Sequence, residues 1–460
     1  MMDPYSIRTY SGFGRSQEAA GYRFAVSSAA DIQTAYQVAA TEGKQIALRG
    51  AGRSYGDPNF AAEQIVLDLT PFNRIHSFDL ESKVIDVEGG ATLEDIWRFC
   101  LPKGAWLPVV SGTTRPTIGG ALAMNIHGKN ALLKGTIGEH VLDLEVVAPS
   151  GTMRLTPEDP LFSVVVSGAG LLGVISRVRL QMKSVSSGMV RVEATHFSNW
   201  ADHFTAFERF EGDAEYVVSW VDGFSTGRGI IHAGWHEEGA PSSLLEASQD
   251  LPARVFGVIP KDQVWRFLKL LNNPIGMRAI NAAKSVSGKT IEHGKVKSQT
   301  LAAFNFLLDY VPDWERAYLP GGLIQCQYFV PKESASDLFP ALLSMCRAEG
   351  LVPYLVVTKR HRPDKLPFVF QHAVDGYSIA MDFKVTEANR SRLWKLADTM
   401  SHEVLSMGGR FYLAKDSTLT AELFQQSIGA RAMERFHTAK AALDPTGLLT
   451  NAQAQRLGLV

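Results

Sequence analysis

The sequence predicts an α+β protein with two domains, and three observations support this. The chain has 460 residues, more than one hydrophobic core usually organises. Up to about residue 190, short runs typical of strands alternate with helical patterns and glycine-rich loops. Beyond that point the alternating strand patterns are longer and tryptophan is more frequent, which indicates a second domain.

The first part of the chain is expected to form short elements separated by turns. Thr92 should cap a helix, because Asp95 three residues later completes a capping box. Leu93, Ile96, Trp97 and Cys100 follow at helical spacing and predict a buried stripe. Cys100 is therefore expected in the core and not in catalysis. The other elements expected here are a helix at 31–41, a short helix at 120–124, and strands at 45–49, 65–69, 84–87, 141–147 and 176–182.

The second part is expected to form a sheet with helices on one side. Residues 239–297 combine helix-like pieces with loop signals such as Asn272-Asn-Pro274, and we expect an irregular region there. The tail from residue 408 is expected to return to the first domain. Strands are predicted at 322–330, 351–359 and 377–385, and helices at 340–348 and 387–405.

Composition excludes several classes of function. Lysine and arginine number 46 against 47 acidic residues, without a basic run, so nucleic-acid binding is not expected. The three cysteines have no metal-type or disulfide spacing. His232 and His236 stand four residues apart but lack a third ligand nearby, so no metal is expected. The sequence contains no apolar signal core and no run of ~20 apolar residues. A cytoplasmic or peripherally membrane-associated protein is expected.

Two glycine-rich loops are candidates for binding an anionic ligand. Arg49-Gly-Ala-Gly-Arg-Ser-Tyr-Gly-Asp57 follows a predicted strand, and a second loop runs from Ser111 to Asn130. Small residues let the backbone approach a ligand, and exposed N–H groups can hold an anion. The pair predicts a loop system for a nucleotide-type cofactor, with His127 and Lys129 beside its reactive end. Taken alone, the second loop is equally typical of a turn before a buried helix.

A third glycine motif, Gly168-Ala-Gly-Leu-Leu-Gly173, matches the pattern of a dinucleotide-binding turn. Such a turn must open a helix. Here the following residues alternate between apolar and polar, as in a half-buried strand. The context therefore argues against a Rossmann NAD site.

Lys415, beside Asp416, follows two glycines and a short strand near the end of the chain. The pair resembles an element of a site, although neighbouring Lys and Asp residues are more often surface ions. Together with the glycine-rich loops and the His127-Gly-Lys-Asn130 cluster, it predicts a protein that holds a large anionic cofactor and works beside it.

These motifs resemble a known family. Residues 49–57, 112–130 and 168–175 are similar to the FAD domain of the vanillyl-alcohol-oxidase type, the PCMH fold. Residues 125–130, 325–327, 381–383 and 412–417 carry a finer resemblance to the decaprenylphosphoryl-β-D-ribose 2'-oxidase family. The resemblance implies a composite FAD-binding domain at 5–190 and 408–460, with a substrate-binding domain at 191–407 between them.

The resemblance also implies the site. Related enzymes with covalent FAD often carry histidine where this chain has Arg53, so non-covalent FAD is expected. The catalytic residues implied are Lys415, His127 and Tyr55, and the substrate-binding residues are Lys129, Gln325, Gln327, Lys359 and Ser378. The cofactor-binding residues implied are Arg49, Gly50, Ala51, Gly52, Arg53, Ser54, Tyr55, Gly56, Asp57, Gly112, Thr117, Ile118, Gly119, Gly120, Met124, Asn125, Ile126, His127, Ile175 and Tyr412.

The implied activity is FAD-dependent oxidation of the 2'-hydroxyl of a lipid-linked sugar phosphate, polyprenyl-phospho-β-D-ribose. The keto product would pass to a short-chain dehydrogenase-type reductase that completes an epimerisation to the arabinose form, for cell-wall or surface glycan synthesis. The chain departs from some members of the family at Ala380 and Ser378, where they carry cysteine and asparagine. The alternatives are an FAD oxidase of a free sugar, alditol or aldonolactone, and a flavin-binding partner protein without turnover.

Overall fold

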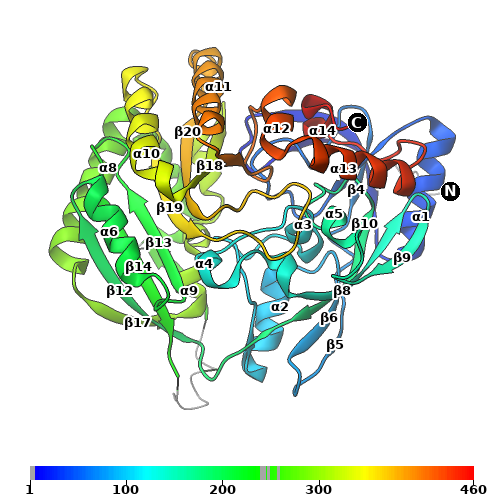
Figure 1. The fold of residues 1–460 in the computed structure, drawn as a ribbon, viewed down its shortest axis with the longest axis horizontal. Coiled ribbons are helices and arrows are strands. Elements are labelled where there is room, and N and C mark those ends of the chain that lie inside the picture. Colours follow the sequence, from blue (N-terminus) through cyan, green and yellow to red (C-terminus); the bar gives the residue numbers. More distant parts are fainter. Residues whose placement is uncertain (1–5, 239–244, 246–248, 256–258) are drawn as a thin grey trace.

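The computed structural model describes residues 6–238, 245, 249–255 and 259–460. Two small sheets lie in one half of the molecule and one large sheet lies in the other (Figure 1). The C-terminal helices return to the half that holds the two small sheets (Figure 1). In the described part of the chain, no helix is long and apolar enough to cross a bilayer.

The first small sheet has the strand order β1-β2-β4-β3, in which β4 pairs in parallel with both β2 and β3. Helix α1 (Ala29–Glu42) begins at Ser28, where Ser28 and Asp31 form a capping box. The Tyr36 hydroxyl on α1 donates to the Val147 carbonyl at 2.8 Å and so joins this layer to the second sheet. The strands are β1 (Ser6–Ser11), β2 (Glu18–Ala25), β3 (Ile46–Arg49) and β4 (Ile65–Asp68).

The second small sheet has the order β5-β6-β10-β8-β9. Helix α2 (Leu93–Cys100) has the predicted capping box of Thr92 and Asp95, and its predicted stripe, Cys100 included, is buried. Residues 168–173 lead into strand β10, which confirms that this glycine motif opens a strand. The strands are β5 (Ile75–Phe78), β6 (Val84–Glu88), β8 (Val141–Ala148), β9 (Gly151–Leu155) and β10 (Val174–Gln181).

The large sheet has eight strands in the order β17-β12-β14-β13-β19-β20-β18-β21. Alternation along β18 turns Cys326 and Tyr328 towards the covering helices, where the Tyr328 hydroxyl lies 3.3 Å from the Ser401 hydroxyl. The opposite face of the same strands is polar. The strands are β12 (Met189–Phe197), β13 (Tyr216–Val221), β14 (Gly229–His236), β17 (Val296–Thr300), β18 (Leu323–Pro331), β19 (Leu355–His361), β20 (Gly376–Lys384) and β21 (Arg410–Phe411).

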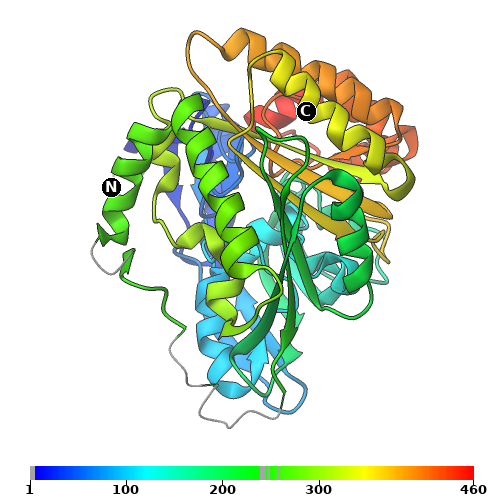
Figure 2. The same cartoon turned by 90° about the vertical axis from the view of Figure 1, so that its left-hand side faces the viewer.

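Helices α6 (Trp200–Phe210), α10 (Lys332–Ala348) and α11 (Arg390–Ser406) cover one side of this sheet (Figures 1 and 2). Helix α10 spans Lys332–Ala348, so the predicted start at Pro340 was wrong. Pro340 lies inside the helix, where the burial of Leu338, Phe339 and Leu342 offsets the hydrogen bond that proline removes. Strand β19 begins at Leu355 and not at the predicted residue 351, because Pro353 cannot donate to a ladder.

The predicted irregular region, 239–297, is mostly regular where it is described. Helices α7 (Val264–Leu271) and α8 (Pro274–Ser287) are joined at Asn273, whose side chain caps α8. Residues 239–244, 246–248 and 256–258 of this prediction lie outside the described residues. Strand β21 shows that residues 410–411 extend the large sheet before the tail leaves it.

The remaining elements are short or lie near the ends of the sheets. The α-helices are α3 (Ile118–Ala123), α4 (Ala131–Lys134), α5 (Phe162–Val165), α6 (Trp200–Phe210), α9 (Leu301–Asn305), α11 (Arg390–Ser406), α12 (Ala421–Ile428), α13 (Ala430–Leu443) and α14 (Ala452–Leu457). Helical turns span η1 (Leu101–Lys103), η2 (Ile137–His140), η4 (Lys261–Gln263), η5 (Gly288–Glu292), η6 (Leu307–Asp309) and η7 (Trp314–Tyr318), and short strands span β7 (Ala105–Trp106), β11 (Lys183–Ser184), β15 (Arg254–Val255) and β16 (Ile259–Pro260).

Candidate active site

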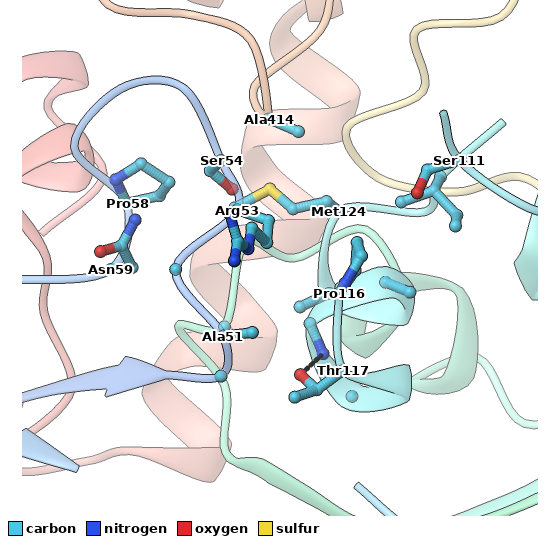
Figure 3. Close-up of a pocket in the computed structure, with 18 of the residues that line it drawn as sticks. Ala51, Arg53, Ser54, Pro58, Asn59, Ser111, Pro116, Thr117, Met124 and Ala414 are labelled. Carbon is cyan, nitrogen blue, oxygen red and sulfur yellow. Dashed lines mark hydrogen bonds between the residues drawn. The ribbon is translucent and has the colours of Figure 1, made fainter. Parts of the chain in front are cut away.

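A deep cavity opens where the predicted glycine-rich loops meet the C-terminal segment. It encloses about 1180 Å³, including the part open to solvent. Figure 3 shows the loop from Ala51 to Asn59 facing the segment from Ser111 to Met124 across it. Most of the predicted cofactor residues line it: Gly50, Ala51, Gly52, Arg53, Ser54, Tyr55, Gly112, Thr117, Gly119, Gly120, Met124, Ile126, Ile175 and Tyr412.

The first loop requires glycine at two of its positions. Gly52 has φ +66°, the left-handed region that glycine adopts without strain. A Cβ on Gly50 would lie 2.2 Å from the Thr117 hydroxyl. That hydroxyl accepts a hydrogen bond from the Gly120 N–H and so caps α3, while the Gly50 backbone packs closely against it (Figure 3). The sequence thus places backbone, without side chains, at the cavity wall.

The cavity suits a flavin dinucleotide. Arg53 lines it, and its Nε is buried without a hydrogen-bond partner among the described residues. Burial lowers the pKa of the Arg53 guanidinium, because it disfavours the charged form. An anion beside the guanidinium would stabilise this charge. In the described chain, the backbone N–H groups from Ala51 to Ser54 donate no hydrogen bond. These donors fit a diphosphate, and the apolar wall around Met124 and Ile126 fits a ring system.

Several predicted cofactor residues do not line the cavity but support its walls. The Asp57 carboxylate forms a buried ion pair with Arg456 at 2.7 Å, so it is committed to the C-terminal helix α14. Arg49 donates to the Ser11 carbonyl at 3.1 Å. A Cβ on Gly56 would lie 2.0 Å from the Asp416 carbonyl oxygen, so glycine there allows close packing of two loops.

The other predicted cofactor residues that do not line the cavity lie behind the second glycine-rich loop. Ile118 is fully buried in the core. Asn125 has φ +44°, and its side-chain oxygen accepts a hydrogen bond from the Gly138 N–H at 3.0 Å, which stabilises the turn after α3. His127 lies beside the Tyr412 ring, at 5.0 Å between ring centroids, and not at the cavity surface. These residues shape the site without facing its interior.

Lys415 lines the cavity beside Tyr55 of the first glycine-rich loop. Its ammonium group lies 3.9 Å from the centre of the Tyr55 ring. Burial lowers the pKa of Lys415, and the Asp382 carboxylate opposes that shift while the Lys359 charge adds to it. In the described chain Lys415 forms no salt bridge, so its amine is available to a ligand.

The polar face of the large sheet carries the predicted substrate residues. In the β18–β20 register Gln325 pairs with Asp382, and Gln327 pairs with Ala380. In the β19–β20 register Lys359 pairs with Ser378. Side chains on alternate residues share a face, so the strands bring these groups together. The Gln325 amide donates to the Asp382 carboxylate, which fixes that acid near Lys415.

His127 is held in a buried network. The Gln327 amide donates to His127 Nε2 at 3.0 Å, and His127 Nδ1 lies 3.2 Å from His372 Nε2. His361 Nε2 lies 2.8 Å from the Ser378 hydroxyl on the same sheet face. Burial lowers the pKa of His127 well below 6.5, and the charge of Lys359 lowers it further. Both ring nitrogens are therefore occupied in a neutral ring, which leaves Lys415 as the freer base.

Lys129 and Lys359 complete a cationic cluster with Lys415. Lys129 donates to the Phe304 carbonyl and lies over the Phe304 ring, 4.1 Å from its centroid. Burial lowers the pKa of Lys129, and the charge of Lys359 adds to the shift. Burial alone lowers the pKa of Lys359 to about 8. Ammonium groups that repel one another at close range are stabilised by an anion that lies between them, such as a phosphate.

Other cavity residues were missed by sequence reasoning. Gly170 and Gly173 belong to the motif rejected as a Rossmann turn, and they line this cavity while β10 follows them. Leu308 comes from the middle of the chain, and its N–H donates to the Gly112 carbonyl at 3.1 Å. Among these residues, only the glycines belong to a sequence motif that could have indicated a place at the cavity. The other missed lining residues are Phe13, Asn59, Leu69, Gly89 and Ala414; Leu48, Pro58, Ser111, Thr113, Pro116, Ala121, Ala123 and Ala169 belong to the stretches in which the cofactor was expected, although they were not named one by one.

Comparison with known proteins agrees with this geometry. A family described as FAD binding domain matches residues 21–156. The chain is 30% identical to decaprenylphosphoryl-beta-D-ribose oxidase of Mycolicibacterium smegmatis over 99% of both chains. It is 25% identical to cytokinin dehydrogenase 1 of Arabidopsis thaliana over 45% of this chain and 37% of that one. It is 26% identical to a D-lactate dehydrogenase of Anaerostipes hadrus over 28% of this chain and 30% of that one.

These findings confirm the predicted α+β fold of the two-domain PCMH type and the predicted cofactor, FAD. They also support turnover, because the three relatives named above are an oxidase and two dehydrogenases. The chain is an FAD-dependent oxidoreductase and belongs to the decaprenylphosphoryl-beta-D-ribose oxidase family.

Proposed function

We propose that this enzyme oxidises the 2'-hydroxyl of a polyprenyl-phospho-β-D-ribose to the 2'-keto sugar. The observation that carries the proposal is the cluster of Lys129, Lys359 and Lys415 beside the cofactor cavity. A free sugar, alditol or aldonolactone offers no anion to such a cluster, whereas a sugar phosphate does. The relative that the chain matches over 99% of its length is named for a substrate of this class.

The reaction removes a proton from the hydroxyl oxygen and a hydride from the carbon. FAD, when bound, supplies the hydride acceptor. We assign the proton to Lys415, because burial favours its neutral amine and this amine reaches the cavity. Tyr55, against which Lys415 packs, limits the positions that the amine can take. His127 holds Gln327 in place through the hydrogen bond to its Nε2.

Binding and orientation fall to the polar face of the large sheet. Lys129 and Lys359 would hold the phosphate, and Gln325, Gln327 and Ser378 would surround the ribose. Ser378 already accepts a hydrogen bond from Gln327 at 3.4 Å, so its hydroxyl shapes this wall. Ala380 lies opposite Gln327 and needs no reactive group for hydride transfer. Position 53 carries arginine and not the histidine to which related enzymes often attach FAD covalently, which supports non-covalent FAD.

The product has a role only if a second enzyme acts on it. A 2'-keto sugar that is reduced from the other face becomes the arabinose epimer. We therefore propose that a reductase of the short-chain dehydrogenase type completes the epimerisation, and that the arabinose unit serves cell-wall or surface glycan synthesis.

The experiment is anaerobic reduction of the FAD-loaded protein, followed by visible absorbance. Polyprenyl-phospho-ribose should bleach the flavin band, while free ribose and an aldonolactone should not. Lys415→Ala should keep the band but bleach about 10² to 10⁴ times more slowly. Lys395→Ala, at an exposed position on α11, is the control and should behave as the parent. Equal bleaching by the free sugar would overturn the substrate class.

A further inference from the structure

Helices α7 and α8 expose large apolar side chains to solvent. On α7, Phe267 is 53% exposed and Leu270 is 76% exposed. On α8, Ile275 is 83% exposed and Val286 is 62% exposed. Positions 275 and 286 are eleven residues apart, close to three full turns, so both side chains lie on one side of the helix. Together with Leu271, these residues form what we call the α7–α8 face.

The segment that carries this face is strongly basic. Residues 259–300 contain eight lysines and arginines against two acidic residues, in a chain whose overall net charge is −1. None of these eight basic side chains forms a salt bridge with a residue that the structure describes. Arg266, Lys269 and Arg278 are exposed and belong to the same helices as the apolar residues. Glu292 acts electrostatically on Lys284 and Lys297, whereas Arg266, Lys269 and Arg278 have no acidic partner within 4.0 Å among the described residues.

Figure 2 shows both helices (green) on the side of the molecule that faces the viewer, where α8 crosses the front of the large sheet. Trp265 lies at the edge of the face, and the Arg266 guanidinium lies 5.2 Å from its ring centroid. An amphipathic helix with exposed leucine and phenylalanine, an aromatic residue and flanking cations has the composition of a segment that lies in a membrane interface.

The inner side of the same helices connects to the cavity. Leu268 and Met277 pack against a cluster that contains Tyr55, Tyr318 and Tyr354. The Phe13 ring lies 5.1 Å from the Tyr55 ring and 5.5 Å from the Trp314 ring, measured between centroids. A continuous apolar layer thus separates the exposed face from the cofactor cavity. A surface bound at this face would lie close to the site.

We infer that the α7–α8 face docks on the surface of an anionic lipid bilayer. Its apolar side chains would enter the headgroup boundary, and its unpaired cations would face acidic headgroups. Each basic residue near an anionic surface strengthens binding by about fivefold, and salt screens this contribution. Removal of one buried leucine or isoleucine should weaken binding by about tenfold. The inference does not depend on the substrate, because it concerns only the exposed face.

The test is flotation of the FAD-loaded protein with two kinds of vesicle: phosphatidylcholine alone, and phosphatidylcholine mixed with phosphatidylglycerol. We expect binding to the mixed vesicles only, with a loss as NaCl is raised. The double variant Leu270→Ser, Ile275→Ser should weaken binding by about 100-fold, and Lys269→Ala by about fivefold. Leu80→Ser is the matched control, because Leu80 is 62% exposed and lies outside this face.

Retention of the flavin band shows that each variant is folded. Absence of binding by the parent protein to the mixed vesicles would overturn the inference. So would equal loss in the Leu80→Ser control and the double variant. Sedimentation velocity tests whether the face instead binds a second copy of this chain. A dimer of the parent protein that dissociates in the double variant would assign the face to that second copy and would also overturn the inference. Each result is independent of whether polyprenyl-phospho-ribose bleaches the flavin.

Discussion

The Lys415 ammonium group lies 3.9 Å from the centre of the Tyr55 ring, although 360 positions separate the two residues in the chain. The backbone fixes this pair, because the Tyr55 N–H donates to the Ala414 carbonyl at 2.9 Å. The first glycine-rich loop and the C-terminal segment are thus joined at the wall of the FAD cavity. A base held in this way cannot move away from the cofactor when the loop binds it.

Arg53 should contribute to cofactor affinity. Arg53→Ala removes a buried guanidinium that lines the cavity without a partner for its Nε, so we expect FAD to bind at least about tenfold more weakly. Fluorescence titration of the apoprotein with FAD measures this. Arg74→Ala is the control, because Arg74 is exposed and lies outside the cavity. Equal affinity in the two variants would remove Arg53 from the diphosphate site.

The rate of flavin reduction should rise with pH and level off. Burial lowers the pKa of Lys415 to about 7, and only the neutral amine can accept a proton, so the rate should increase through that region. Asp382→Asn removes a charge that raises the pKa of Lys415, and should move the midpoint to lower pH. Stopped-flow reduction across pH 5 to about 9 gives both midpoints. A midpoint that moves upward in the variant would contradict this account.

Lys359 should affect both substrate binding and the pH profile. Loss of a charged hydrogen bond to phosphate should raise KM by about 10 to 100-fold in Lys359→Met. Because the Lys359 charge lowers the pKa of Lys415, the variant should also move the midpoint to higher pH, opposite to Asp382→Asn. Steady-state kinetics and stopped-flow reduction measure the two effects. A change in KM without any change of midpoint would place Lys359 too far from Lys415 to act on it.

Stability should fall in mild acid. Burial lowers the pKa of His203 from 6.5 to about 3, so below pH 6.5 the unfolded chain takes up a proton that the folded chain does not. The contribution is present in full above pH 6.5 and is lost as pH falls towards 3. His203→Gln should reduce the slope of unfolding free energy against pH by up to about 1.4 kcal/mol per unit. Denaturant unfolding at several pH values measures the slope.

His402→Gln is the control for this prediction. The His402 side chain is 63% exposed, so its pH slope should match that of the parent. A His203→Gln slope equal to the control would show that His203 is not buried as a neutral ring.

Local signals predicted the scaffold of the site well. The capping box of Thr92 and Asp95 and the buried stripe to Cys100 follow from residues within two turns of each other, and both are confirmed. The glycine-rich loops are also recognisable in the sequence, because only a residue without Cβ allows a contact as close as that of Gly50 with Thr117. The start of α10 was mistaken for Pro340 because packing, and not propensity, decides whether a helix continues through proline.

Contacts between residues far apart in the chain could not be predicted from local sequence patterns. Nothing near Asp57 indicates that Arg456, at the other end of the chain, takes its carboxylate away from the cavity. Likewise, Leu308 reaches the cavity only because its N–H is tied to Gly112. The pairing of Lys359 with Ser378 depends on strand register, which a single sequence does not fix. The resemblance to a family named Lys359 and Ser378, but it counted Asp57 among the cofactor residues and did not name Leu308.

The most direct measurement is the deuterium isotope effect on flavin reduction by polyprenyl-phospho-ribose labelled at single carbons. If the hydride leaves from C2', deuterium at that carbon should slow anaerobic bleaching of the flavin band severalfold, while deuterium at C3' should leave the rate unchanged. An effect from C3' alone, or no bleaching by this substrate at all, would contradict the proposed 2'-oxidation.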